Sequence, residues 1–213
     1  MDVKPNTPTT IQLFPRHSVN LITGPTNIGK TYYVTQLIQR YSYYFQAPID
    51  RVVIIVCNDR IQPLELSEEV PLSIEYILWS DFTVDQLCEN DLVVIDDLQD
   101  LSPTLKETIS VCAHHFNLAA LFVITHSLLG SQHFELLTLC HRILLFTQAS
   151  AIHRLANYIF DHFIPDPEQK HYLKTIYQYC FNQGEVLLVE LNPLARAPSP
   201  FIAFSHLLHP KFH

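Results

Sequence analysis

The amino-acid sequence predicts an α/β protein with a doubly wound, mainly parallel sheet. Three strand-like runs, at 51–57, 92–95 and 119–125, are apolar at nearly every position. Helical patterns alternate with these runs, and a loop with two glycines joins the first strand to the first helix. A strand without polar alternation is typical of a parallel sheet that helices cover on both faces.

The first half of the chain starts with a β-prone run at 19–23, which stops at a glycine-proline pair. From 30 to 44, apolar residues repeat at a spacing of three to four, which predicts an amphipathic helix. A buried strand at 51–57, a weaker strand at 74–78 and a short helix near 82–88 follow.

The second half repeats this alternation. Ser102 and Pro103 provide an N-cap and a first-turn proline for a helix that runs to about residue 116. The other elements are expected as strands at 92–95, 119–125, 142–146 and 186–191 and as helices at 150–163 and 168–181.

Length and composition narrow the class of protein. The 213 residues suit one domain, with 1–18 and 193–213 expected as irregular tails. Charged residues make up 16% and the hydrophobic set 48%, which excludes general disorder. Without an 18-residue apolar run or a secretion signal, a soluble intracellular protein that does not contact membranes is expected. The five cysteines form no C-x-x-C pair, so neither a disulfide framework nor a zinc site is expected.

Residues 24–31, which we call the phosphate loop, read GPTNIGKT and match the pattern G-x-x-x-x-G-K-[ST] between a strand and a helix. Glycines let backbone N–H groups turn towards phosphate oxygens at a helix N-terminus, where unsatisfied amides favour anions. We expect Lys30 to reach the β- and γ-phosphates of ATP and Thr31 to bind Mg²⁺. The residues expected to bind the nucleotide are Gly24, Pro25, Thr26, Asn27, Ile28, Gly29, Lys30 and Thr31.

Asp96 and Asp97 directly follow the buried strand at 92–95. After a phosphate loop, one carboxylate at such a position holds the magnesium shell and its neighbour can deprotonate the attacking water. We assign the first role to Asp96 and the second to Asp97. A double acid also favours hydrolysis over phosphoryl transfer to a small acceptor, because water needs a base beside the metal.

Thr125, His126 and Ser127 follow the next buried strand. A polar side chain there can sense the γ-phosphate or align the attacking water, and His126 is the best candidate. A histidine bonded to a neighbouring loop is the alternative. Metal binding by Cys112 and His114 is disfavoured, because positions i and i+2 of a helix point to different faces.

The motifs GPTNIGKT, LVVIDDLQD and LFVITHSLL, with HRILLF, resemble the FtsK/HerA-type packaging ATPases of double-stranded DNA viruses. The likeness extends over about 13–208 and is closest to the short ATPases of adenovirus-like viruses and Polinton/Maverick elements. It implies a ring-forming homo-oligomeric motor that uses Mg²⁺ and ATP to thread double-stranded DNA into a capsid. The implied partners are a capsid or portal protein, and the implied location is the host nucleus or the virion assembly site.

Two features depart from this family. His126 stands where relatives usually carry Gln, and 147–151 lack the arginine that relatives tend to carry a few residues beyond the 142–146 strand. Such an arginine stabilises charge on the transferring γ-phosphoryl group. Arg142, Arg154 or another subunit is expected to supply it.

Charge and arginine content leave alternatives open. With 13 basic and 21 acidic residues, the net charge of −8 requires a local patch for any DNA contact, for which the candidates are Arg51, Arg60, Lys106 and Arg142. A nucleotide-binding switch or weak ATPase is the main alternative. A nucleoside or nucleotide kinase is less favoured, because the seven arginines are scattered rather than gathered in a lid.

Overall fold

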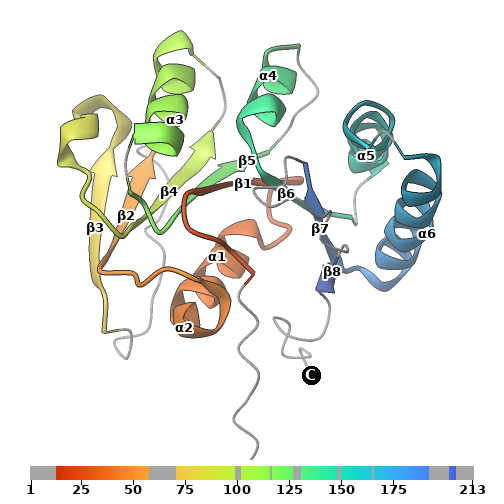
Figure 1. Cartoon of the computed structure of the whole chain (residues 1–213), viewed down its shortest axis with the longest axis horizontal. Coiled ribbons are helices and arrows are strands. Elements are labelled where there is room, and N and C mark those ends of the chain that lie inside the picture. Colours follow the sequence, from red (N-terminus) through yellow and green to blue (C-terminus); the bar gives the residue numbers. More distant parts are fainter. Residues whose placement is uncertain are drawn as a thin grey trace, which may run out of the picture.

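A computed structural model describes residues 13–57, 71–98, 102–115, 117–126, 131–147, 150–164, 166–191 and 202–204. These residues form an eight-stranded sheet in the order β3-β2-β4-β5-β1-β6-β7-β8, with helices on both faces (Figure 1). The strands are β1 (Ser18–Thr23), β2 (Arg51–Val56), β3 (Ser73–Leu78), β4 (Asp91–Leu98), β5 (Ala120–Thr125), β6 (Arg142–Phe146), β7 (Val186–Glu190) and β8 (Ile202–Phe204). Strands β1 to β6 pair in parallel, whereas β7 runs antiparallel to β6 and β8 antiparallel to β7.

The helices divide between the two faces of the sheet and create two apolar cores. They are α1 (Lys30–Gln39), α2 (Tyr41–Tyr44), α3 (Pro103–His115), α4 (Ser131–Leu139), α5 (Ser150–Phe163) and α6 (Pro167–Gln183). Neighbouring residues of β1 serve opposite cores: Leu21 packs with residues of α3, α4 and α5, and Ile22 packs with residues of α1 and α2. Burial on both faces explains why the central strands lack polar alternation.

Most expected elements are present, and the predicted fold class is confirmed. The structure differs in a few places. The helix expected at 30–44 is divided at Arg40 into α1 and α2, and the one near 82–88 is replaced by two 3-10 turns, η1 (Trp79–Asp81) and η2 (Val84–Gln86). Helix α4 and strand β8 were not expected. Among the described residues of the expected tails, Phe14 is fully buried against Phe45 and Phe122.

None of the described helices has the length and apolar character needed to cross a bilayer.

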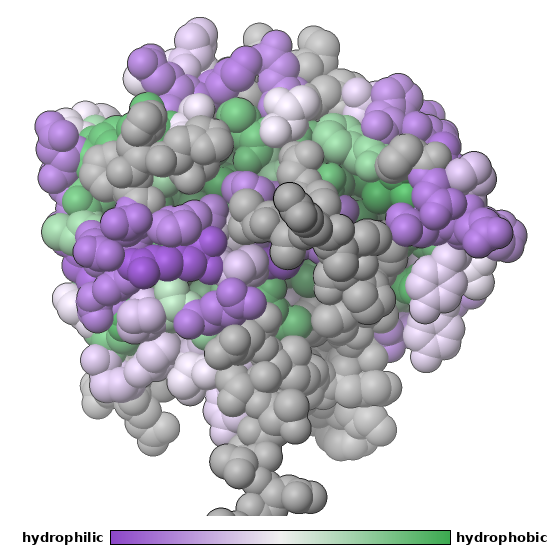
Figure 2. Space-filling model, in the orientation of Figure 1, coloured by the Kyte–Doolittle hydropathy of each residue, from purple (hydrophilic) through white to green (hydrophobic). Residues whose placement is uncertain are grey.

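The outer side of α6 is largely hydrophilic (Figure 2). Its exposed residues include Lys174 and Gln178, while Leu173 and Tyr177 face the core.

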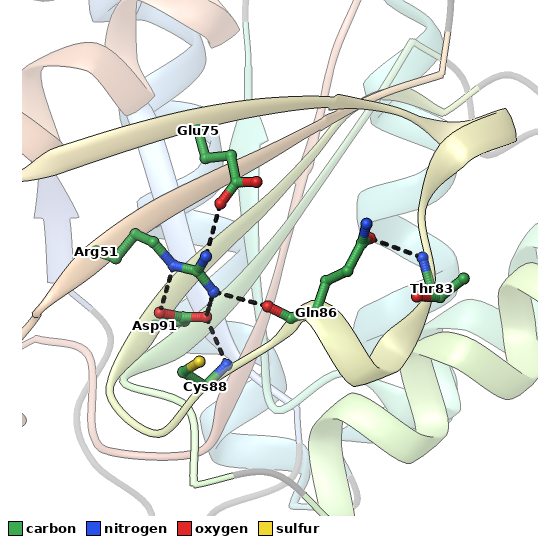
Figure 3. A network of polar contacts seen from close by, with 6 residues as sticks. All are labelled: Arg51, Glu75, Thr83, Gln86, Cys88 and Asp91. Carbon is green, nitrogen blue, oxygen red and sulfur yellow. Dashed lines mark hydrogen bonds and ion pairs between the residues drawn. The ribbon is translucent and has the colours of Figure 1, made fainter.

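A polar network joins the amino ends of β2, β3 and β4 (Figure 3). The Arg51 guanidinium donates through Nε and Nη2 to the two carboxylate oxygens of Asp91, at 3.1 and 2.6 Å, and through Nη1 to Glu75 at 2.6 Å. Asp91 is 1% exposed and also accepts from the Cys88 amide. Arg51 is therefore engaged inside the fold, at the edge of the sheet opposite the phosphate loop.

This network leads to a stability prediction. Replacing Arg51 with Met should lower the free energy of unfolding by about 3 kcal/mol, because the buried Asp91 carboxylate loses its charged partner. The control is Lys106→Met, which breaks the exposed pair with Glu135 and should cost less than about 1 kcal/mol. Urea unfolding of both variants measures the difference. Equal, small losses would show that the Arg51 network does not stabilise the sheet.

Candidate functional site

The phosphate loop joins β1 to α1 at the carboxyl edge of the sheet, and its two glycines are required by geometry. A Cβ atom on Gly24 would lie 2.8 Å from the Cβ of Phe146, which no side chain tolerates. Gly29 has φ +91°, a left-handed conformation that favours glycine. Gly29 is also the N-cap of α1 and offers no side-chain oxygen to the first-turn amides. Those amides are thus available to an anion.

The carboxyl edge holds a pocket of about 500 Å³ beside this loop. It unites residues from three parts of the chain that the sequence marked separately: the phosphate loop, the acid pair near the end of β4 and the histidine after β5. The lining residues are Thr26, Asn27, Gly29, Lys30, Thr31, Asp96, Asp97, Ile124 and His126. Of the other expected nucleotide-binding residues, Gly24 and Pro25 contribute carbonyl groups that contact Lys30, and Ile28 packs against the core beneath the loop.

Lys30 is the buried cation of the pocket, with 4% of its surface exposed. Its Nζ donates to the carbonyl oxygens of Gly24 and Pro25, both at 2.7 Å, and lies 3.2 Å from Nδ1 of His126. Burial lowers the pKa of Lys30 to about 8, although the charges of Asp96 and Asp97 act in the opposite direction. A desolvated ammonium group that keeps most of its charge at neutral pH is well suited to bind phosphate oxygens.

The acid pair lies at a distortion of the sheet. The pairing of β4 with β5 is in step from Leu92 to Ile95 and then shifts by one residue at Leu98. Asp97 adopts φ 58° within this bulge, a left-handed conformation that costs a non-glycine residue about 1 kcal/mol or more. Such strain is common where a side chain is directed into a functional site.

Asp96 and Asp97 are both buried, with 4% and 6% of the surface of the whole residue exposed. Burial raises the pKa of Asp96, and the charge of Asp97 adds to this effect. A backbone hydrogen bond from Asp97 and the nearby His126 and Lys30 oppose it. Carboxylates gathered in this way favour an additional cation between them and the phosphate loop.

His126 connects the acid pair with the phosphate loop. Its Nε2 contacts Oδ1 of Asp97, and its Nδ1 lies 3.2 Å from Nζ of Lys30 and 3.4 Å from Oγ1 of Thr26. One ring therefore touches both the acid pair and the phosphate loop. The alternative interpretation, a histidine bonded to a neighbouring loop, describes the contacts with Thr26 and Lys30 but not the contact with Asp97.

Thr31 and Asp96 fit the expected Mg²⁺ site. Both line the pocket and offer a hydroxyl and a carboxylate oxygen, the donor types that Mg²⁺ prefers. Mg²⁺ usually keeps several waters and shares substrate phosphates, so two protein ligands suffice. In the part of the chain that is described, no three His, Cys, Asp or Glu side chains gather as a metal-binding group.

The two candidate arginines are not brought to the pocket. Arg142 begins β6, at the opposite edge of the sheet, and donates to the Leu13 carbonyl at 2.7 Å and to Glu190 at 2.9 Å. With its side chain 12% exposed, it is committed to these contacts and poorly placed to reach a neighbouring subunit. Arg154 is exposed on α5, the helix that follows β6. An arginine that stabilises charge on the γ-phosphoryl group is called an arginine finger. This role, expected for Arg142 or Arg154, does not fit the geometry of Arg142, and Arg154 is the remaining candidate of the two.

Sequence reasoning missed two properties of the pocket. Ile124 forms part of its wall, although the sequence marked it only as an apolar residue of a buried strand. The direct contact of His126 with Asp97 was also not foreseen. Both properties depend on β4 and β5 being neighbours in the sheet. The order of the elements along the chain does not reveal which strands are neighbours. Ser127 lies outside the described residues.

Comparison with solved structures finds the same fold in viral packaging proteins. The genome-packaging NTPase B204 from Sulfolobus turreted icosahedral virus 2 in complex with ATP-gammaS is 14% identical, with a TM-score of 0.51 over 88% of this chain and 96% of that chain. Its complex with AMPPCP is 13% identical, with a TM-score of 0.52 over 89% of this chain and 97% of that chain. The DNA-packaging ATPase B204 from Sulfolobus turreted icosahedral virus is 13% identical, with a TM-score of 0.50 over 89% of this chain and 97% of that chain.

At such low identity these likenesses show the fold alone. Neither the protein-family models nor the curated proteins gave a match to the sequence. The chain therefore has the mostly parallel α/β fold of P-loop NTPases.

Replacing Lys30 with Ala should weaken ATP binding by about 100-fold, because the phosphates lose their buried cationic partner. The fold should persist, since the hydrogen bonds of Lys30 go to loop carbonyls and not to the core. Titration with a fluorescent ATP analogue measures the affinity, and circular dichroism checks the fold. Lys106→Ala is the control for loss of one positive charge. Unchanged affinity in a folded Lys30→Ala protein would refute the site.

Proposed function

We propose that this chain is a Mg²⁺-dependent ATPase that acts as one subunit of a ring-shaped, FtsK/HerA-type motor and moves double-stranded viral DNA into a capsid. The observation that carries the enzymatic part is the pocket that joins the phosphate loop to Asp96, Asp97 and His126. The packaging part is supported by the resemblance of the motifs and by the nature of the proteins that share the fold.

The residues of the pocket divide the work of hydrolysis. The loop amides and Lys30 would bind the phosphates, while Thr31 and Asp96 would hold Mg²⁺, which neutralises charge on the phosphate oxygens when bound. Asp97, with His126 attached to it, would activate the attacking water. Each role is assigned to a side chain that lines the same cavity.

DNA binding must come from few cations, since the net charge is −8. Of the four candidates, Arg51 and Arg142 are engaged in internal contacts, and Arg60 lies outside the described residues. Lys106 is exposed, in a pair with Glu135. A ring in which each subunit supplies one or two phosphate contacts fits this charge. A capsid or portal protein as partner, and action in the host nucleus or at the virion assembly site, belong to the same proposal.

A second candidate function is a nucleotide-dependent switch that binds ATP without rapid turnover. The arginines favour it, since 147–151 contain none and Arg142 is engaged inside the fold. A switch needs the phosphate loop and the magnesium ligands, but it does not need a finger.

The decisive experiment is steady-state ATP hydrolysis with and without duplex DNA, together with the mass of the Mg-ATP-bound protein in solution. The motor predicts turnover that DNA stimulates and a mass of several subunits. A monomer that binds ATP and never hydrolyses it would favour the switch. Turnover by a ring that DNA does not affect would leave an ATPase and contradict DNA translocation.

Replacing Asp97 with Asn should reduce kcat by at least about 100-fold while the affinity for Mg-ATP stays within about three-fold, because the pair of Asp97 and His126 serves the attacking water. Asp96→Asn should instead weaken the binding of Mg-ATP. The control is Asp161→Asn, which removes an exposed carboxylate on α5. Equal loss of affinity and turnover in the Asp97 variant would show that the two roles are wrongly divided.

A further inference from the structure

The position of His126 bears on which group takes the proton from the attacking water. Its side chain is 36% exposed, whereas that of Asp97 is 8% exposed. Asp97 contacts the ring through Oδ1. The imidazole is the more accessible of the two bases, and it faces the phosphate loop through Thr26 and Lys30.

The neighbours of the ring identify its tautomer. Lys30 has an ammonium group, which can only donate, so Nδ1 of His126 must accept at that contact. The carboxylate of Asp97 accepts, so Nε2 must carry the hydrogen. Neutral His126 with hydrogen on Nε2 satisfies both partners at once. Its basic nitrogen, Nδ1, then points towards the loop that would hold the phosphates.

This arrangement is that of a base oriented by a carboxylate. In such a pair the carboxylate holds one N–H of the imidazole, selects the tautomer and stabilises the imidazolium, while the other nitrogen accepts the proton of the nucleophile. Asp97 makes its contact with the ring from a left-handed backbone conformation. Lys30 covers Nδ1 in the present geometry, and phosphate oxygens would compete for the same ammonium group.

Resting on the proposed ATPase function, we propose that His126 is the general base and that Asp97 is its positioning residue. The water oxygen forms a bond to the γ-phosphorus as the bond between that phosphorus and the bridging oxygen of ADP breaks. The water proton passes to Nδ1 of His126, and Nε2–H stays on Asp97. The imidazolium then releases the proton to solvent from its exposed side, which restores the neutral ring. Binding of the phosphates draws Lys30 away and uncovers Nδ1, so the base is released when the substrate is in place.

The test separates a base from a residue that only holds Asp97 in place. His126→Gln keeps an N–H for Asp97 and a carbonyl oxygen for Lys30, but an amide cannot accept the proton. The proposal predicts that kcat falls by at least about 100-fold in this variant while the affinity for Mg-ATP stays within about three-fold. In His126→Ala, added imidazole should restore part of the lost turnover. His171→Gln, an exposed histidine on α6, is the matched control and should keep full activity.

A second measurement needs no turnover. Two-bond proton–nitrogen correlation spectra of the imidazole rings, with His126 assigned from its absence in His126→Gln, should show hydrogen on Nε2 only. Asp97→Ala should convert this signal to a mixture of tautomers, because the acceptor on Nε2 is lost. Hydrogen on Nδ1 in the wild-type protein would overturn the proposal.

The outcomes also distinguish this proposal from the proposed function. If the wild-type protein hydrolyses ATP and His126→Gln keeps more than about a third of its kcat, the ATPase stands and His126 is not the base. Loss of turnover in His126→Ala without recovery in imidazole, together with an active Gln variant, would also exclude His126 as the base. A wild-type protein that binds ATP but does not hydrolyse it contradicts both.

Discussion

The parallel pairing of β5 with β4 on one side and β1 on the other is the constraint on which the site depends. Carboxyl ends of parallel strands meet at one edge of a sheet, so the segments that follow these three strands are forced together. The phosphate loop follows β1, the acid pair ends β4 and His126 follows β5. If any one of these strands were antiparallel, its polar residues would lie at the opposite edge.

The two edges of the sheet differ in their electrostatics. At the amino edge, Arg51 and Arg142 are matched with carboxylates at the starts or ends of neighbouring strands, and these pairs serve the fold. At the carboxyl edge, Lys30 has backbone carbonyls and an imidazole as its direct partners. A cation without a carboxylate in direct contact can be transferred to a phosphate at lower cost than one taken from a buried ion pair.

Much of this fold could be predicted because its signals are local. The uniform burial of β2, β4 and β5 produces apolar runs in the sequence, and the phosphate loop has a distinctive spacing. Helix α4 escaped prediction because QHFELLTL has no clear polar face, and β8 because three residues carry no periodicity. The antiparallel direction of β7 depends on how the chain returns after α6, which no local pattern records.

The residues of the site were predictable as a set, but their contacts were not. The motifs placed Asp96, Asp97 and His126 at the carboxyl ends of strands and Lys30 at the start of a helix. In the structure Asp96 and Asp97 lie near the end of β4, His126 follows β5, and Lys30 begins α1. That His126 touches Asp97 depends on a one-residue shift between β4 and β5, and such a shift leaves no trace in a single sequence. The finger could not be predicted from motifs at all, since it can act across a subunit boundary.

The close approach of Gly24 to Phe146 gives the molecule a mechanical property. Phe146 is the last residue of β6, its ring packs edge-on against Tyr33 of α1 at 5.6 Å, and α5 with Arg154 begins four residues later. Dense packing transmits displacement rather than absorbing it. A displacement of Phe146 would therefore reach the phosphate loop through Gly24 and helix α1 through Tyr33 at the same time.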